Sequence, residues 1–122
     1  MTLNGVDIKN NIFYKNAHYA LDSCDAHGSD VAVDHNLCFG NGYGQYDFAR
    51  QGSDYSYSLG TTLSTDPHFM NGSSANFDAH FRRTIPAMQA GLNLYSVFTT
   101  DKDGATRPAV GPWNLGAYIY AP

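Results

Sequence analysis

The segment around Asp101 carries the residue types and spacing best suited to chemistry in this chain. Asp101 and Asp103 stand just before Gly104, and such an Asp-x-Asp-Gly turn offers hard carboxylate oxygens that could chelate calcium. The later acidic ligands of an EF-hand loop are missing, so Ca²⁺ is a candidate and no cofactor is assigned. In the alternative, which we favour, Arg107 bonds a nearby carboxylate or backbone carbonyls and locks the C-terminal tail against the last coil of the repeat described below.

Four tyrosines fall in a segment rich in glycine and serine: Tyr43, Tyr46, Tyr55 and Tyr57. Such rings could stack on sugars, which makes a polysaccharide a candidate ligand. They could equally cap an apolar interior or line a dimer interface, where tyrosine is enriched. The sequence leaves these three interpretations open.

The other reactive side chains form no catalytic motif. No Ser-His-Asp set, phosphate loop or dinucleotide fingerprint is present. The two cysteines, Cys24 and Cys38, fit no metal spacing, and we expect both to be free, with a disulfide only if the chain is exported. The histidines also lack metal-ligand spacing, and a structural role is expected for each of them: His18, His27, His35, His68 and His80.

The composition favours β-strands joined by tight turns. Of the 122 residues, 43% are hydrophobic and only 15% are charged, and Gly, Asn, Ser, Thr and Tyr make up much of the rest. The formal charge is −4 without a basic stripe, which disfavours a nucleic-acid partner. No segment approaches a membrane span and the first residues do not resemble a signal peptide, so a cytoplasmic location is expected for the chain as given.

Two segments near the N-terminus, residues 6–16 and 31–41, align without gaps at a constant offset. Each begins with the period-two alternation of a strand that buries one face, and an asparagine, Asn11 or Asn36, then suits a sharp bend. Stacked side chains of this kind can hydrogen-bond as a ladder. A unit of this size cannot bury its apolar face alone, so we expect stacked coils, with a sandwich or barrel as the competing all-β arrangement.

We expect one domain over residues 1–122. Residues 1–41 form two stacked coils, 42–62 a Tyr/Gly-rich excursion, and 63–122 the last coil and the tail. Within the last part the sequence predicts a strand after Asp66-Pro67, strands over 76–81 and 116–120, and one helical turn over 86–91.

The second half of the chain resembles the C-terminal region of right-handed parallel β-helix proteins of the pectate-lyase-like superfamily. The motifs that carry this resemblance are Asp66-Pro67-His68-Phe69, Asp78-Ala79-His80-Phe81, Pro86-Ala87-Met88-Gln89-Ala90-Gly91, Asp101-Lys102-Asp103-Gly104 with Arg107-Pro108, and Gly116-Ala117-Tyr118. The resemblance implies an all-β fold, a short right-handed parallel β-helix with an irregular C-terminal tail. It implies little about activity, because this tail is shared by proteins of many functions.

The same resemblance suggests a place for catalysis. Lyases of this fold use outward Lys, Arg or Asp side chains to bind a metal and to abstract a proton from an acidic sugar, which makes Lys9, Asp7 and Asp34 candidates. In the stacked arrangement Lys9 lies over Asp34, and the alternative is a solvated charge pair of little energetic value. We favour the alternative and assign no catalytic residue.

Three classes of function remain open at this point. The first is a non-catalytic module that self-associates as a homodimer through its uncovered first coil. Such a module could also bind a carbohydrate. The second is a polysaccharide lyase or hydrolase, or a fragment of one, whose relatives are typically secreted. The third is a gene remnant carried on a mobile element. We favour the first, because the chain offers no acid–base constellation.

Overall fold

The computed structural model describes residues 2, 4–23, 27–48 and 55–120. The described residues form an all-β structure with one 3-10 helix. The elements are β1 (Val6–Lys9), β2 (Ile12–Tyr14), β3 (Tyr19–Asp22), β4 (Val31–Asp34), β5 (Asn36–Phe39), β6 (Gly44–Asp47), β7 (Tyr57–Leu59), β8 (Thr62–Leu63), β9 (Phe69–Asn71), β10 (Asp78–Phe81) and η1 (Pro86–Gln89).

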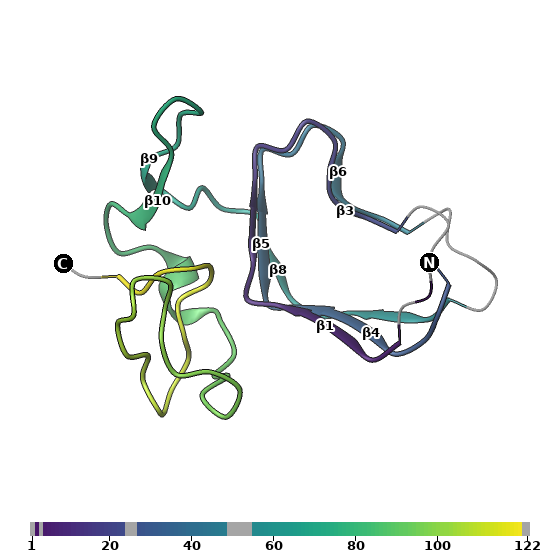
Figure 1. Cartoon of the computed structure of the whole chain (residues 1–122). Helices are drawn as coiled ribbons and strands as arrows, with labels where there is room; N and C mark the ends of the chain where they lie inside the picture. The colour runs from purple at the N-terminus through teal and green to yellow at the C-terminus, as the bar shows by residue number, and fades with distance from the viewer. Residues whose placement is uncertain (1, 3, 24–26, 49–54, 121–122) are drawn as a thin grey trace.

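Three parallel sheets are built from strands that lie far apart in the sequence. Their strand orders are β1-β4-β7, β2-β5-β8 and β3-β6. Val6 pairs with Val31 and Val31 with Tyr57, so equivalent positions recur along the chain at a nearly constant interval. We call β1–β3 layer 1, β4–β6 layer 2, and β7 with β8 layer 3. Figure 1 looks along the stack, so the layers overlie one another and the sheets form the sides of an open outline.

The corner between the first two strands of a layer is made by a residue with left-handed backbone. Asn10 has φ 61° and His35 has φ 50°, and Asn10 donates its backbone N–H to the carbonyl of His35 at 3.1 Å. The sequence placed this bend at Asn11 and Asn36, one residue too late. Asn and His are among the residues that enter this region most readily, so the chain turns without a glycine.

Asn11 and Asn36 instead connect the layers just beyond the corner. The Oδ1 atom of Asn36 accepts the backbone N–H of Asn11 at 2.9 Å and its side-chain Nδ2 at 3.1 Å. The Nδ2 atom of Asn36 donates upward to the carbonyl of Ile8 at 2.8 Å. Asn36 is fully buried, so these bonds replace the water that its amide would otherwise bind.

A second amide clamp of the same kind follows β2. The Oδ1 atom of Asn41 accepts the backbone N–H of Asn16 at 3.0 Å, and its Nδ2 donates to the carbonyl of Phe13 at 3.0 Å. In both clamps the lower residue accepts an N–H from the layer above and donates to a carbonyl of that layer. The clamp is therefore directional, from layer 2 up to layer 1.

The apolar side chains form one core inside the layers and another beside them. Val31, Val33 and Phe48 are the buried centre of the inner core. On the other face of the β2-β5-β8 sheet, Leu37 packs with Ala87 and Leu115 of the tail. Alternation along the strand explains the division, because successive side chains point to opposite faces. In Figure 1 the hairpin and the tail accordingly lie on the outer side of β5 and β8.

The structure differs from the expected excursion over residues 42–62. Three segments of this range are strands of the stack: β6 pairs with β3, β7 with β4, and β8 with β5. The strands β6 and β7 contain Tyr, Gly and Ser and lack the apolar alternation of β1 and β4, so the sequence predicted only a short strand near the end of the Tyr-rich segment and not the pairing of three strands with the stack. Residues 49–54 of the expected excursion lie outside the described part of the chain.

In the tail, two of the three expected strands are present. The strands β9 and β10 form an antiparallel hairpin, and η1 supplies the expected helical turn. No strand forms over 116–120, because the backbone N–H groups there have scattered partners. Gly116 donates to the carbonyl of Asn10, and Ile119 donates to the carboxylate of Asp101.

Among the described residues, no helix is long and apolar enough to cross a membrane.

The Asn36→Ala substitution should destabilise the fold by about 2 kcal/mol, because it removes the interlayer hydrogen bonds of a fully buried amide and leaves the N–H of Asn11 and the carbonyl of Ile8 without these partners. Asn11→Ala removes an exposed amide from the same ladder, and its expected effect is below about 1 kcal/mol. Chemical denaturation of the two variants beside the unsubstituted chain measures the difference. Equal effects would contradict the directional clamp.

Candidate functional site

An open cleft of about 800 Å³ lies between layer 1 and the tail. Its floor is β2 with the corner that precedes it. Its far wall comes from the hairpin and the tail, including Phe77, Phe98, Thr100, Lys102 and Ala117. The walls mix polar and apolar side chains, and the rings of Phe77 and Phe98 are about half exposed. It therefore combines a strand edge with uncovered aromatic rings.

The backbone of β2 is an open strand edge in this cleft. Asn11 accepts the backbone N–H of Leu37, and Lys15 donates to the carbonyl of Phe39, so these two residues face layer 2. In a parallel strand alternate residues direct their backbone groups to opposite sides. The N–H and C=O groups of Ile12 and Tyr14 consequently face the cleft, and β2 is the edge strand of its sheet.

Asn10 fastens the tail against layer 1. Its side-chain amide donates to the carbonyl of Leu92 and accepts the backbone N–H of Leu92, both at 2.8 Å. Its own carbonyl accepts the N–H of Gly116 at 2.7 Å. Gly116 has φ 80°, and a Cβ atom there would lie 2.9 Å from Ile12 Cδ1, so the close approach of tail and floor requires glycine.

Arg107 is buried in the tail, with only 4% of its surface exposed. Its guanidinium donates to the carbonyls of Gly116 at 2.9 Å and Asn114 at 3.4 Å, and it lies 5.0 Å from the ring centre of Trp113. Burial lowers the pKa of Arg107, and the charge of Asp101 opposes this change. The expected bonds to backbone carbonyls are present, but they hold the tail together internally and do not reach the last layer.

Asp101 organises a turn of the tail. Its Oδ1 atom accepts the backbone N–H groups of Asp103 and Ala105 at 2.9 Å, and Oδ2 accepts that of Ile119 at 3.0 Å. Burial acts to raise the pKa of Asp101, but these hydrogen bonds outweigh it and the pKa is lowered. Three N–H donors around one carboxylate occupy the oxygens that a calcium ion would need. Asp103 points elsewhere, to His80, so the two candidate calcium ligands are not brought together.

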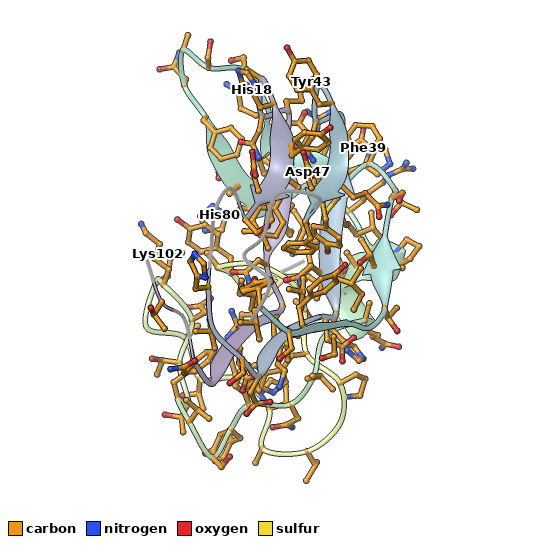
Figure 2. The ribbon with its side chains drawn as sticks, turned by 90° about the vertical axis from the view of Figure 1, so that its right-hand side faces the viewer. His18, Phe39, Tyr43, Asp47, His80 and Lys102 are labelled. Carbon is orange, nitrogen blue, oxygen red and sulfur yellow. The ribbon has the colours of Figure 1, made fainter. Side chains whose placement is uncertain are left out.

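The sequence did not identify the cluster around His80. Its Nδ1 lies 2.5 Å from Asp78 Oδ1, its Nε2 lies 2.8 Å from Asp103 Oδ2, and its ring stacks on Tyr118. The bond to Asp103, together with that to Asp78, raises the pKa of His80. The spacing of Asp78 and His80 along β10 was a usable signal, but nothing local pointed to Asp103. Figure 2 places His80 near Lys102, whose Nζ lies 5.8 Å from the ring centre of Tyr118.

The structure brings together only two of the three candidate catalytic residues. Lys9 pairs with Asp7 at 2.8 Å. Asp34 is the register partner of Lys9, but its carboxylate turns away to accept the N–H groups of Thr61 at 2.7 Å and His35 at 2.8 Å. Burial acts to raise the pKa of Asp34, and the bond from Thr61 and those from His35 outweigh it, so the pKa is lowered. Asp34 therefore closes a corner between layers 2 and 3.

The four tyrosines do not form one platform. Three of them, Tyr46, Tyr55 and Tyr57, pack around Phe48 towards the layer 3 end of the inner core. Tyr46 also shares a hydrogen bond with Thr62 at 2.9 Å, and burial raises its pKa to about 12. Tyr43 stands apart, 64% exposed, with its ring against His18. Figure 2 shows this pair at one end of the molecule.

Cys38 is free and buried, and burial raises the pKa of its thiol. Cys24 lies outside the described residues. Within the described part of the chain, no group of three or more His, Cys, Asp or Glu side chains is placed to hold a metal ion.

Comparison with known proteins yields no match to a protein family, to a curated protein or to a solved structure.

Arg107→Ala should lower the stability of the chain by about 3 kcal/mol and its melting temperature by roughly 10 °C. The substitution leaves two carbonyls and the face of Trp113 without the guanidinium. Lys102→Ala, in the same tail but exposed, is the matched control and should change stability by less than about 0.5 kcal/mol. An unchanged melting temperature for Arg107→Ala would refute the structural role.

The His80 cluster should make stability depend on pH. Because the pKa of His80 is raised, its contribution is present below the ordinary histidine value of about 6.5 and is lost as pH rises through the raised value. Because the pKa of Asp78 is lowered, its contribution is lost only as pH falls through that lowered value. The melting-temperature difference between the unsubstituted chain and His80→Gln should thus be largest near about pH 5.5 and vanish near about pH 9.

The matched control for this measurement is His18→Gln, which removes a histidine that contacts Tyr43. A His80→Gln difference that stays constant across the pH range would show that the two carboxylates do not bind a protonated ring.

Proposed function

We propose that the chain is a short right-handed parallel β-helix with an irregular tail, which acts as a non-catalytic module and self-associates through its open layer 1. The β-helix assignment is supported by three parallel sheets, in which register partners recur along the chain at a nearly constant interval. The tail motifs that resemble those of the pectate-lyase-like superfamily add to it. A layer is then one coil of the helix.

The observation that carries self-association is the unequal burial of equivalent residues in layers 1 and 2. Val31 and Val33 are 2% and 0% exposed, whereas their register partners Val6 and Ile8 are only partly buried. The difference in burial arises because layer 1 covers layer 2, whereas no layer of the described structure covers layer 1. A second copy placed coil end to coil end supplies that cover, and each contact is made twice across the two-fold axis.

The geometry gives less support to the alternative of a polysaccharide lyase or hydrolase. General acid–base catalysis needs side chains that converge on one substrate position. Lys9 and Asp7 neutralise each other, and Asp34 is committed to the corner with Thr61. Turnover of a uronate polymer that disappears in Lys9→Ala would reverse this ranking. Carbohydrate binding without catalysis retains one candidate, Tyr43.

Light scattering at micromolar concentration should give twice the chain mass of 13.3 kDa. Ile8→Arg places a charge in the partly buried apolar end of layer 1 and should give a monomer. Leu59→Arg is the matched control at the opposite end of the stack, where Leu59 is already 52% exposed, and should remain a dimer.

Circular dichroism verifies that both variants stay folded. A monomeric unsubstituted chain removes the proposed function. A dimer that is lost in Leu59→Arg and kept in Ile8→Arg would show that the chain self-associates through layer 3, which contradicts the proposal.

A further inference from the structure

We propose that the cleft beside β2 is a binding site for an extended polypeptide segment of another molecule, which adds to β2 as a parallel strand. The segment has the pattern Asn-Leu/Ile-x-aromatic-x-Asn, with an acidic residue two positions ahead of it. This inference rests on the proposed function only in using the open layer 1, and it goes further by naming the partner's chemistry and direction.

The contacts between layers 1 and 2 specify what the cleft can bind. Leu37 donates its backbone N–H to the carbonyl of Asn11, and Phe39 accepts the N–H of Lys15. Ile12 and Tyr14 are the register partners of Leu37 and Phe39, and their equivalent backbone groups face the cleft. A segment lying over β2 as β2 lies over β5 would therefore satisfy them. No new geometry is needed, because the chain already makes this interface once.

The two amide clamps fix the register of the segment. Asn36 and Asn41 each accept a backbone N–H from layer 1. Asn11 and Asn16 occupy the same two positions one layer higher, and both are exposed beside the cleft. Their Oδ1 atoms are the acceptors for the first and last asparagine N–H groups of the bound segment. A segment held in this register runs parallel to β2, as β2 runs parallel to β5.

The walls select the side chains of the segment. The ring of Tyr14 stacks on that of Phe39 at 6.1 Å between ring centres, and it also contacts Phe77 of the far wall. An aromatic residue over Tyr14 would extend this row of rings. The leucine or isoleucine two positions earlier lies over Ile12, which packs against the tail core.

Charge selects the acidic residue ahead of the pattern. Lys9 and Lys102 line the cleft together with Asp101, and Lys9 also pairs with Asp7 at 2.8 Å. In layer 2 the register partner of Lys9 is Asp34, so a segment with the sequence of layer 2 carries an aspartate over Lys9. A segment with the sequence of layer 1 instead sets lysine over lysine. The sequence Asp-His-Asn-Leu-Cys-Phe-Gly-Asn of residues 34–41 therefore fits the cleft better than that of residues 9–16.

The test uses a capped, fluorescent peptide with the sequence of residues 34–41 and Cys38→Ser, titrated with the full chain. Fluorescence anisotropy should show saturable binding. N-methylation of the peptide at Gly40 removes the donor to the Tyr14 carbonyl and should weaken binding at least about tenfold. N-methylation at Phe39 blocks an N–H that faces away from β2 and should have little effect. A peptide with the sequence of residues 9–16 should bind several-fold more weakly.

On the protein, Asn16→Ala should weaken peptide binding about fivefold through loss of one hydrogen bond. Gln45→Ala removes an exposed amide of layer 2 that bonds to Ser64, away from the cleft, and serves as the matched control. Absence of saturable binding, or equal binding of the two N-methylated peptides, would overturn the proposal.

The two proposals fail in different ways. If the chain is monomeric at every concentration but binds the peptide, self-association is refuted and the strand-binding site stands. If the chain dimerises but does not bind the peptide at concentrations where the dimer has dissociated, the strand-binding site is refuted and self-association stands.

Discussion

Hydrogen bonding between layers is the constraint on which the rest of this structure depends. A layer of this chain has short strands, so its backbone groups and its apolar side chains can be satisfied only by the layer above or below. Asn36 and Asn41 make this dependence specific, since the side-chain amide of each accepts a backbone N–H from layer 1 and donates to a backbone carbonyl of layer 1. The burial of Val31 and Val33 follows from the same stacking.

The tail converts a stack of layers into a fold with a second core. It does not lie under the last layer but packs on the outer face of the β2-β5-β8 sheet, where Leu37 is a buried residue of the outer core. Its shape is set by buried polar contacts: Arg107 holds two carbonyls inside the tail, and Asn10 joins the tail to the corner of layer 1. The cleft exists because this wall stands beside a strand edge that it does not cover.

The sequence predicted those parts whose contacts repeat at a fixed interval. The register of Val6 with Val31 and the stacked pair of Asn11 and Asn36 follow from one constant offset. It missed the third strand of layers 1 and 2, β3 and β6, because Tyr19 and Gly44 share no pattern although they pair. It also missed the turn of Asp34 towards Thr61 and the bond of His80 to Asp103. These contacts join residues far apart in the chain through side-chain direction, which no local pattern records.

The two ends of the stack are chemically different, and this difference gives the module a direction. At the layer 1 end the clamp positions are held by Asn11 and Asn16. The Nδ2 atom of Asn11 donates to the carbonyl of Lys9 and to Asn36, so it is the Oδ1 atom of Asn11 that can serve a further layer, as an acceptor. At the other end Thr62 pairs with Asn36. The spacing from Asn36 to Thr62, applied to Asn41, leads to Pro67. Proline has neither an amide side chain nor a backbone N–H, so no clamp can form at that position. Phe48 with Tyr55 and Tyr57 packs the inner core near that end. Strand addition is thus chemically provided for at layer 1 and terminated at layer 3, and this difference is why we propose the cleft beside β2, and not the opposite end of the stack, as the site of strand addition.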